Sequence, residues 1–288
     1  MSTTAAWHDY YELCKPRVVL LMLVTAWVGM ALSTQQIPTP SLILWASLGI
    51  ACCASSAAVI NHLVEISIDK KMRRTQNRPL AGGRLIWQKA LLFSLILGGI
   101  GFALLYTQVN PLTAWLTLGS QLTYALFYTL FLKHATPQNI VIGGIAGAAP
   151  PLLGWTSVTN AIDPNSLLLV LIIFAWTPPH FWALALYRQA DYEKSGLPML
   201  PVTHGVAFTK LNILLYTLLL ICTTLCPFIF QMSGLPYLVG VLPLNAWFLW
   251  HTWRLYRDAS CQHGLKVFWV SIWYLLYLFV LLLVDHYI

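Results

Sequence analysis

Charged side chains are scarce in this chain of 288 residues. Its 16 basic and nine acidic residues make up only 9% of the sequence, whereas 58% of the residues are hydrophobic. A water-exposed surface normally needs roughly a quarter of its residues to be charged. The composition therefore excludes a soluble globular protein and predicts an integral membrane protein.

Three other patterns are missing. The six cysteines show no C-x-x-C spacing, so we interpret them as small apolar packing residues rather than as a metal or redox site. No soluble module with interleaved aromatic and basic residues accompanies the net charge of +7, which argues against a nucleic-acid partner. The first apolar segment is too long for a removed signal peptide and lacks a small-residue cleavage site, so we expect it to be retained.

Long apolar segments are what the sequence has instead. About 20 such residues cross about 30 Å of hydrocarbon as a helix, and the alternation typical of membrane strands is absent. We therefore predict an all-α polytopic membrane protein that forms a single domain over residues 1–288. Its nine transmembrane helices are expected at 17–35, 42–62, 86–106, 112–132, 138–157, 166–186, 210–230, 235–253 and 267–285.

The positions of Lys and Arg indicate the orientation. All 16 fall before the first predicted helix or in the loops on that same side. Since cytoplasmic loops retain positive charge during insertion, the pattern predicts a multi-pass protein of the inner (cytoplasmic) membrane. Its N-terminus would be cytoplasmic and its C-terminus outside, with the lipid bilayer as its surroundings.

One stretch gathers the scarce charges. "NHLVEISIDKKMRRTQNRPL", residues 61–80, places Asn61, Glu65 and Asp69 at i, i+4 and i+8, which stacks their oxygen atoms on one helix face. Such oxygen ligands suit Mg²⁺, which takes one or two carboxylates together with substrate phosphate. The basic residues that follow suit phosphate oxygens. For the bases alone a plain cytoplasmic loop whose acids pair with neighbouring bases is the favoured explanation, whereas Asn61, Glu65 and Asp69 together favour a functional site.

A second stretch, "WTPPHFWALALYRQADYEKSGLPMLPV" (176–202), sets Asp191 and Glu193 beside Arg188 and Lys194. It faces the same side as the first, so the two stretches are expected to close on a magnesium diphosphate. The proline pairs at 178–179 and 150–151 leave helix carbonyls free, which is tolerated at membrane depth only beside a cavity or other protein. We therefore expect the helices to surround a central cavity.

With these motifs the chain resembles the intramembrane UbiA-type prenyltransferases, and among them the protohaem IX farnesyltransferase (haem O synthase) family. The resemblance covers most of the chain and includes "KPRVVLLMLVTA", the motif from Asn61 to Leu80, "TPQNIVIGGIAGAAPPLLGW" and the stretch from Trp176. It implies a nine-helix bundle around a cavity that opens toward lipid. It also implies a reaction in which farnesyl diphosphate, with Mg²⁺, alkylates a vinyl group of haem B and water adds to give haem O.

The resemblance also implies roles for individual residues. Four would bind Mg²⁺ and serve catalysis: Asn61, Glu65, Asp69 and Asp191. The diphosphate contacts would be Arg17, Arg73, Arg78, Arg188, Lys194, Tyr128 and Lys133. The haem contacts would be His180, as an axial ligand of the iron, together with His62 and Trp182, and the ring face of Trp182 also suits a carbocation. Two positions depart from the pattern: Glu65 stands where aspartate is usual, and Ser195 stands where the wider superfamily has a second aspartate.

Several alternatives stay open. His180 is equally suited to pairing a helix carbonyl freed by Pro178 and Pro179. Other activities compatible with the sequence are a prenyltransferase for an aromatic acid or quinone precursor, a transporter, and a non-catalytic haem-delivery factor. A transporter usually carries ionisable residues near mid-membrane, and here the spans are nearly free of charge. The expected partners are farnesyl diphosphate, haem B, and either haem-copper oxidase assembly machinery or a second copy of the chain.

Overall fold

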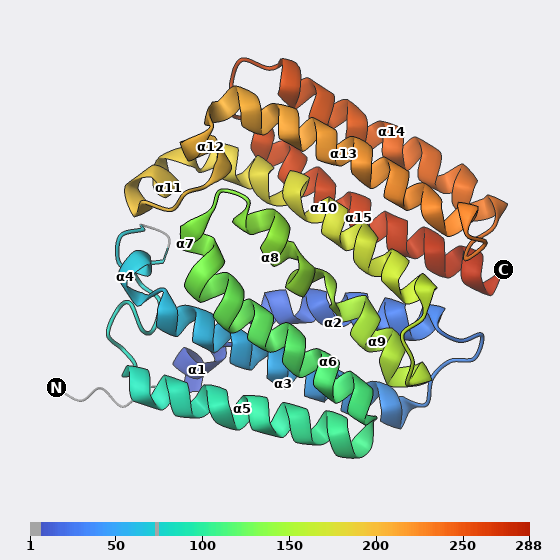
Figure 1. Ribbon diagram of the computed structural model, residues 1–288, viewed down its shortest axis with the longest axis horizontal. Coiled ribbons are helices and arrows are strands. Elements are labelled where there is room, and N and C mark those ends of the chain that lie inside the picture. The colour runs from blue at the N-terminus through green and yellow to red at the C-terminus, as the bar shows by residue number, and fades with distance from the viewer. Residues whose placement is uncertain (1–6, 73–74) are drawn as a thin grey trace.

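The computed structural model describes residues 7–72 and 75–288, and within these ranges the chain forms helices and no strand (Figure 1). The prediction of an all-α protein is confirmed. The helices are α1 (Trp7–Leu13), α2 (Pro16–Leu32), α3 (Pro40–Val64), α4 (Ile66–Asp69), α5 (Trp87–Gln108), α6 (Pro111–Leu122), the π-helix η1 (Thr123–Leu132), α7 (Lys133–Ala135), α8 (Asn139–Ala148), α9 (Pro150–Thr159), α10 (Pro164–Tyr187), α11 (Gln189–Ser195), α12 (Leu200–Thr203), α13 (Gly205–Ile229), α14 (Leu235–Arg257) and α15 (His263–Tyr287).

Three of the long helices begin with the same local signal. The side chains of Thr39, Asn110 and Asp163 each accept a hydrogen bond from a backbone N–H of the first turn of α3, α6 and α10. Proline follows each of these caps, where its fixed φ suits the first helical position and its missing N–H costs nothing. The helix starts are thus set by the sequence itself.

Each of the nine segments expected to cross the membrane lies on a helix or on two consecutive helices. By length and apolarity, six of the described helical segments can cross a membrane, or seven if α1 and α2, which meet at a bend of 49°, count as one span. The segment at 112–132 is split between α6 and η1, which have 12 and 10 residues. α14 is a continuous helix of 23 residues, but polar residues such as Asn245 and His251 make it less apolar than the other long helices.

The short helices gather at one end of the bundle. In Figure 1, α4, α7, α11 and α12 lie at the left end, where α3 ends, and the C-terminus lies at the right. Two surface cavities of about 490 and 700 Å³ lie at the opposite end from α4, lined by the end of α2, the α2–α3 and α13–α14 loops and the end of α15. The residues predicted to form the site belong to the end with the short helices.

Glycine allows α2 and α9 to pack with their backbones in contact. A Cβ atom on Gly154 of α9 would lie 1.9 Å from the carbonyl oxygen of Ala26, and one on Gly29 of α2 would lie 2.0 Å from that of Pro151. Neither position has room for any side chain. Membrane helices approach closely through such small-residue contacts, and this contact holds α2 directly against α9.

A buried polar network joins the last three long helices. Asn245 of α14 accepts a hydrogen bond from the Tyr274 hydroxyl of α15 at 2.6 Å and donates one to the Thr224 hydroxyl of α13 at 3.1 Å. Tyr237 in turn donates to the Thr224 carbonyl. All four residues are buried. Since an unpaired polar group in an apolar interior is costly, the network holds these helices in one register.

Replacing Asn245 with Leu is expected to lower the free energy of unfolding by about 1–2 kcal/mol, because two interhelical hydrogen bonds are lost and the Tyr274 hydroxyl is left without its acceptor. Thermal unfolding of the purified protein in detergent measures the change. Asn212→Leu is the matched control, since the Asn212 amide binds only the Phe208 carbonyl of its own helix. Equal melting temperatures for the two variants would contradict the prediction.

Candidate active site

Asn61, Glu65 and Asp69 lie where α3 passes into α4, and all three are buried, with 3%, 5% and 3% of their surface exposed. The backbone bonds of Glu65 N–H to the Asn61 carbonyl and of Asp69 N–H to the Glu65 carbonyl continue the helical spacing across the junction. The Asn61 amide donates to Glu65 Oε1 at 2.7 Å. The spacing in the sequence thus becomes a line of oxygen atoms inside the protein.

Each of these three side chains has a cationic partner of its own. Lys15 donates to Asn61 Oδ1 at 2.6 Å, and Lys133 forms a hydrogen-bonded ion pair with Glu65 Oε1. Arg78 donates from Nη1 to both carboxylate oxygens of Asp69, at 2.8 Å each. The cluster therefore contains two carboxylates and three cations. Asn61, Glu65 and Asp69 each offer an oxygen that already contacts a positively charged nitrogen.

Burial and the neighbouring lysine act in opposite directions on the pKa of Glu65. Burial by itself raises the pKa of its carboxyl group, but the Lys133 ammonium, assisted by Lys15 and the Asn61 amide, holds the pKa below its usual value. Glu65 is thus kept ionised inside the protein. A buried carboxylate is stable only when it is paired in this way.

The segment directly before Lys133 is the π-helix η1. η1 carries the stacked rings of Tyr124 and Tyr128, whose centroids are 5.5 Å apart. The Thr129 hydroxyl donates to the Tyr124 carbonyl, five residues earlier, at 2.8 Å. Space for the Tyr128 ring comes from Gly143 of α8, where a Cβ would lie 2.2 Å from the ring. π-Helical turns are rare and occur frequently at functional sites.

Lys15 is a site residue that the sequence analysis missed, because it was given no role of its own although it begins the "KPRVVLLMLVTA" motif. It lies between α1 and α2 with φ at 50°, in the left-handed region that a residue before proline rarely adopts. The available signal was its place directly before Pro16. A proline that begins a membrane helix fixes the preceding residue at the edge of the bilayer.

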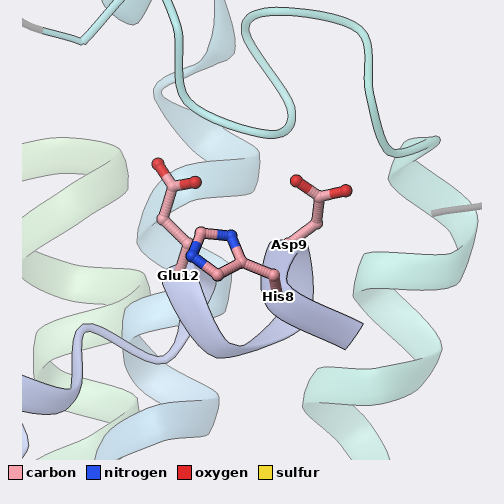
Figure 2. A group of neighbouring side chains, drawn as sticks. All are labelled: His8, Asp9 and Glu12. Atoms are coloured by element: carbon pink, nitrogen blue, oxygen red, sulfur yellow. The ribbon is translucent and has the colours of Figure 1, made fainter. Parts of the chain in front are cut away.

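α1 is held in place by a second ion-pair cluster. His8, Asp9 and Glu12 bring their ligand atoms within 4.8 Å of one another, and Figure 2 shows both carboxylates on the same side of the helix. Arg84, however, binds Asp9 Oδ1 at 2.8 Å and Glu12 Oε2 at 2.7 Å. The cluster therefore holds α1 against the segment that precedes α5. Glu12, which belongs to it, is three residues before Lys15.

The residues predicted on the second stretch lie at the same end of the bundle but outside the buried cluster. Arg188 caps α10 and Asp191 is half-buried on α11, which packs on α10 and α12. Lys194, also on α11, and Arg17, on α2, are exposed. In Figure 1, α11 lies at the same end as α4 and α7. Arg73 lies outside the described residues.

The three residues predicted to contact haem are not gathered in one place. His180 lies on the side of α10 that faces α15, and its Nδ1 pairs with the Ser271 hydroxyl at 2.7 Å instead of with a carbonyl of its own helix. Trp182 lies on another side of α10, edge-on to Tyr216 of α13. His62 is buried beside the metal-ligand candidates, with Nδ1 4.0 Å from Asp69 Oδ2 and neither ring nitrogen hydrogen-bonded.

The structure is that of an all-helical membrane protein whose buried acidic residues and their basic partners gather at one end. Comparison with known proteins identifies its family. The model of the UbiA prenyltransferase family matches residues 22–283, so the chain belongs to this family. Among solved structures, one reported for digeranylgeranylglyceryl phosphate synthase superposes with a TM-score of 0.81, at 18% identity over 98% of each chain. A UbiA homologue from Archaeoglobus fulgidus, bound to DMAPP and Mg²⁺, superposes with a TM-score of 0.71, at 17% identity over 95% of this chain and 99% of that one.

Curated relatives are similar along the whole chain. The protoheme IX farnesyltransferase of Hahella chejuensis is 60% identical over 290 residues, which covers all of this chain and 97% of the relative. That of Teredinibacter turnerae is 58% identical over 289 residues and covers all of this chain and 93% of the relative.

Proposed function

We propose that the protein transfers a farnesyl group from farnesyl diphosphate to a vinyl group of haem B, with addition of water, to give haem O and diphosphate. The observation that carries the proposal is the buried line of Asn61, Glu65 and Asp69, each paired with a basic side chain. The full-length similarity to relatives named protoheme IX farnesyltransferase supports haem B as the acceptor. An aromatic acid or quinone precursor is the alternative acceptor within the same family.

The donor set fits Mg²⁺. Asn61, Glu65 and Asp69 offer amide and carboxylate oxygens, the ligands that Mg²⁺ prefers, and those oxygens now hold the cationic nitrogens of Lys15, Lys133 and Arg78. Asp191 would complete the metal site from α11. When bound, Mg²⁺ would neutralise charge on the diphosphate as it leaves.

Three basic side chains of the cluster would act on the leaving group. Ionisation breaks the bond between the farnesyl carbon and the diphosphate oxygen, and the electron pair stays on the diphosphate. Lys15, Lys133 and Arg78 would donate hydrogen bonds to its oxygens. Charge grows there in the transition state, so cations placed in advance lower the barrier most at that point. Further diphosphate contacts are proposed for Arg17, Arg73, Arg188, Lys194 and Tyr128.

The haem side of the reaction is assigned to α10. The π electrons of the haem vinyl group attack the farnesyl cation, water adds to the cation formed on the haem side chain, and the added water loses a proton. His180, whose neutral imidazole suits iron, would bind the haem iron. His62 and Trp182 stay predicted haem contacts. A central cavity open to lipid would keep stray water from the farnesyl cation.

The proposed function also requires a particular membrane topology and particular partners. The chain would form one domain with nine spans in the inner membrane, the N-terminus in the cytoplasm and the C-terminus outside. Such a topology puts α4, α7 and α11 at the cytoplasmic edge, where farnesyl diphosphate is accessible. Its product would pass to haem-copper oxidase assembly, and a second copy of the chain is the other proposed partner.

The test supplies the purified full-length protein in lipid membranes with farnesyl diphosphate, Mg²⁺ and either haem B or 4-hydroxybenzoate. The expected result is a haem product whose mass has increased by one farnesyl group and one hydroxyl group, with no prenylated benzoate. Prenylation of the benzoate alone would overturn the haem assignment and leave the family assignment intact.

A further inference from the structure

Aromatic rings hold the His180 imidazole in one orientation. The ring is 8% exposed and is stacked between Trp176, with centroids 4.2 Å apart, and Phe268 of α15, with centroids 4.5 Å apart. Phe181 approaches edge-on at 5.0 Å. Because both flat faces are covered, the imidazole can offer a ligand only an edge of the ring.

Ser271 of α15 determines which nitrogen that edge presents. Its hydroxyl oxygen lies 2.7 Å from His180 Nδ1, and the hydroxyl donates its single proton to the Phe268 carbonyl at 2.6 Å. The hydroxyl can therefore only accept from His180, which requires the proton of the neutral imidazole to be on Nδ1. This hydrogen-bond pattern leaves the lone pair on Nε2.

Ser271 is also tied to one of the covering rings. The indole N–H of Trp176 donates to the Ser271 carbonyl at 2.8 Å. One residue of α15 thus fixes both the imidazole and the indole stacked on it. Serine in an apolar helix commonly bonds a carbonyl of its own helix, and Ser271 does so while accepting from α10 as well.

We infer that Ser271 is a positioning residue for haem, which holds His180 in the tautomer and orientation that direct the Nε2 lone pair at iron. The inference rests on the proposed haem-binding role of His180. A hydrogen bond from the far nitrogen of a ligating histidine fixes the ring and makes the other nitrogen a stronger donor, and its loss typically weakens metal binding about 10- to 100-fold. Nothing in the sequence pairs residues 180 and 271, which are 91 positions apart.

The experiment titrates haem B into the full-length protein in detergent and records the resonance Raman band of the bond between ferrous iron and histidine. We expect Ser271→Ala to shift this band to lower frequency and to raise the Kd for haem about 10-fold. Ser271→Thr, which keeps the hydroxyl, should restore both. Ser157→Ala is the matched control, because Ser157 is buried and donates only to the Gly154 carbonyl of its own helix, at 2.6 Å.

His180→Ala separates the proposed ligand role of His180 from the positioning role of Ser271. If it abolishes the iron–histidine band while Ser271→Ala resembles the Ser157→Ala control, Ser271 has no positioning role and His180 remains the ligand. If Ser271→Ala and Ser271→Thr lose the band alike, packing and not the hydroxyl is responsible, and the inference also fails. A band that survives His180→Ala would remove the ligand role itself.

Discussion

Asp69→Asn will reduce prenyl transfer at least about 100-fold, a loss typical of removing one preorganised electrostatic contact from a transition state. The substitution keeps the shape of the side chain but removes a charge from the site that would hold Mg²⁺. It also leaves the Arg78 guanidinium, now bonded to both Asp69 oxygens, without its counter-charge. The rate of product formation from farnesyl diphosphate and haem B, at saturating haem, measures the effect.

Asp163→Asn is the control for this change. Asp163 caps α10 by accepting from the Asn165 N–H, and an asparagine oxygen can do the same. We expect the control to retain full activity. A haem-bound absorption spectrum should be unchanged in both variants, which separates lost catalysis from lost folding. If Asp69→Asn transfers farnesyl at the normal rate, the metal role of the cluster is wrong. If the wild type and Asp69→Asn both transfer no farnesyl but bind and release haem alike, the protein is a haem-delivery factor.

Gly154→Ala will destabilise the fold by about 3 kcal/mol, the upper range for overpacking a tight interior. The new methyl group would lie 1.9 Å from the Ala26 carbonyl oxygen, so α2 and α9 must move apart. Backbone cannot yield in the way that a flexible side chain does. Thermal unfolding and the yield of monodisperse protein in mild detergent measure the effect.

Gly147→Ala provides the comparison on the neighbouring helix. A Cβ at Gly147 of α8 meets nothing within 4 Å, and alanine favours a helix over glycine. We expect this variant to be as stable as the wild type or slightly more so. Should the two alanine variants unfold at the same temperature, the close contact between α2 and α9 contributes nothing to stability.

Local sequence spacing predicted the helices and the face on which Asn61, Glu65 and Asp69 lie, because helical periodicity depends only on neighbouring residues. It could not predict their partners. Lys133 is 68 positions from Glu65 and Lys15 is 46 from Asn61, and the folded chain alone brings them together. The π-helix η1 adds a second obstacle, since its longer turn has no signature in a pattern read at 3.6 residues per turn.

The haem candidates show the same limit in another form. His180 and Trp182 lie in one motif, and the sequence analysis predicts that both contact haem. Residues two positions apart on a helix, however, are separated by about 200° of rotation. The structure accordingly places His180 against α15 and Trp182 against α13. The sequence also could not predict that His180 pairs with Ser271 and not with a freed carbonyl of its own helix, because the two residues are 91 positions apart.

The pairing of each acidic or amide ligand with its own lysine or arginine has a consequence for substrate entry. In the structure the buried carboxylates of Glu65 and Asp69 are neutralised by Lys133 and Arg78 without any bound ligand, while Lys15 contributes a positive charge that contacts only the Asn61 amide oxygen. On the proposed mechanism, Asn61, Glu65 and Asp69 would hold Mg²⁺ with the oxygens that now contact basic side chains, and Lys15, Lys133 and Arg78 would become free to pair with the diphosphate. The ligand oxygens would thus exchange one set of positive charges for another, and the three basic side chains would already lie beside the leaving group when its bond begins to break.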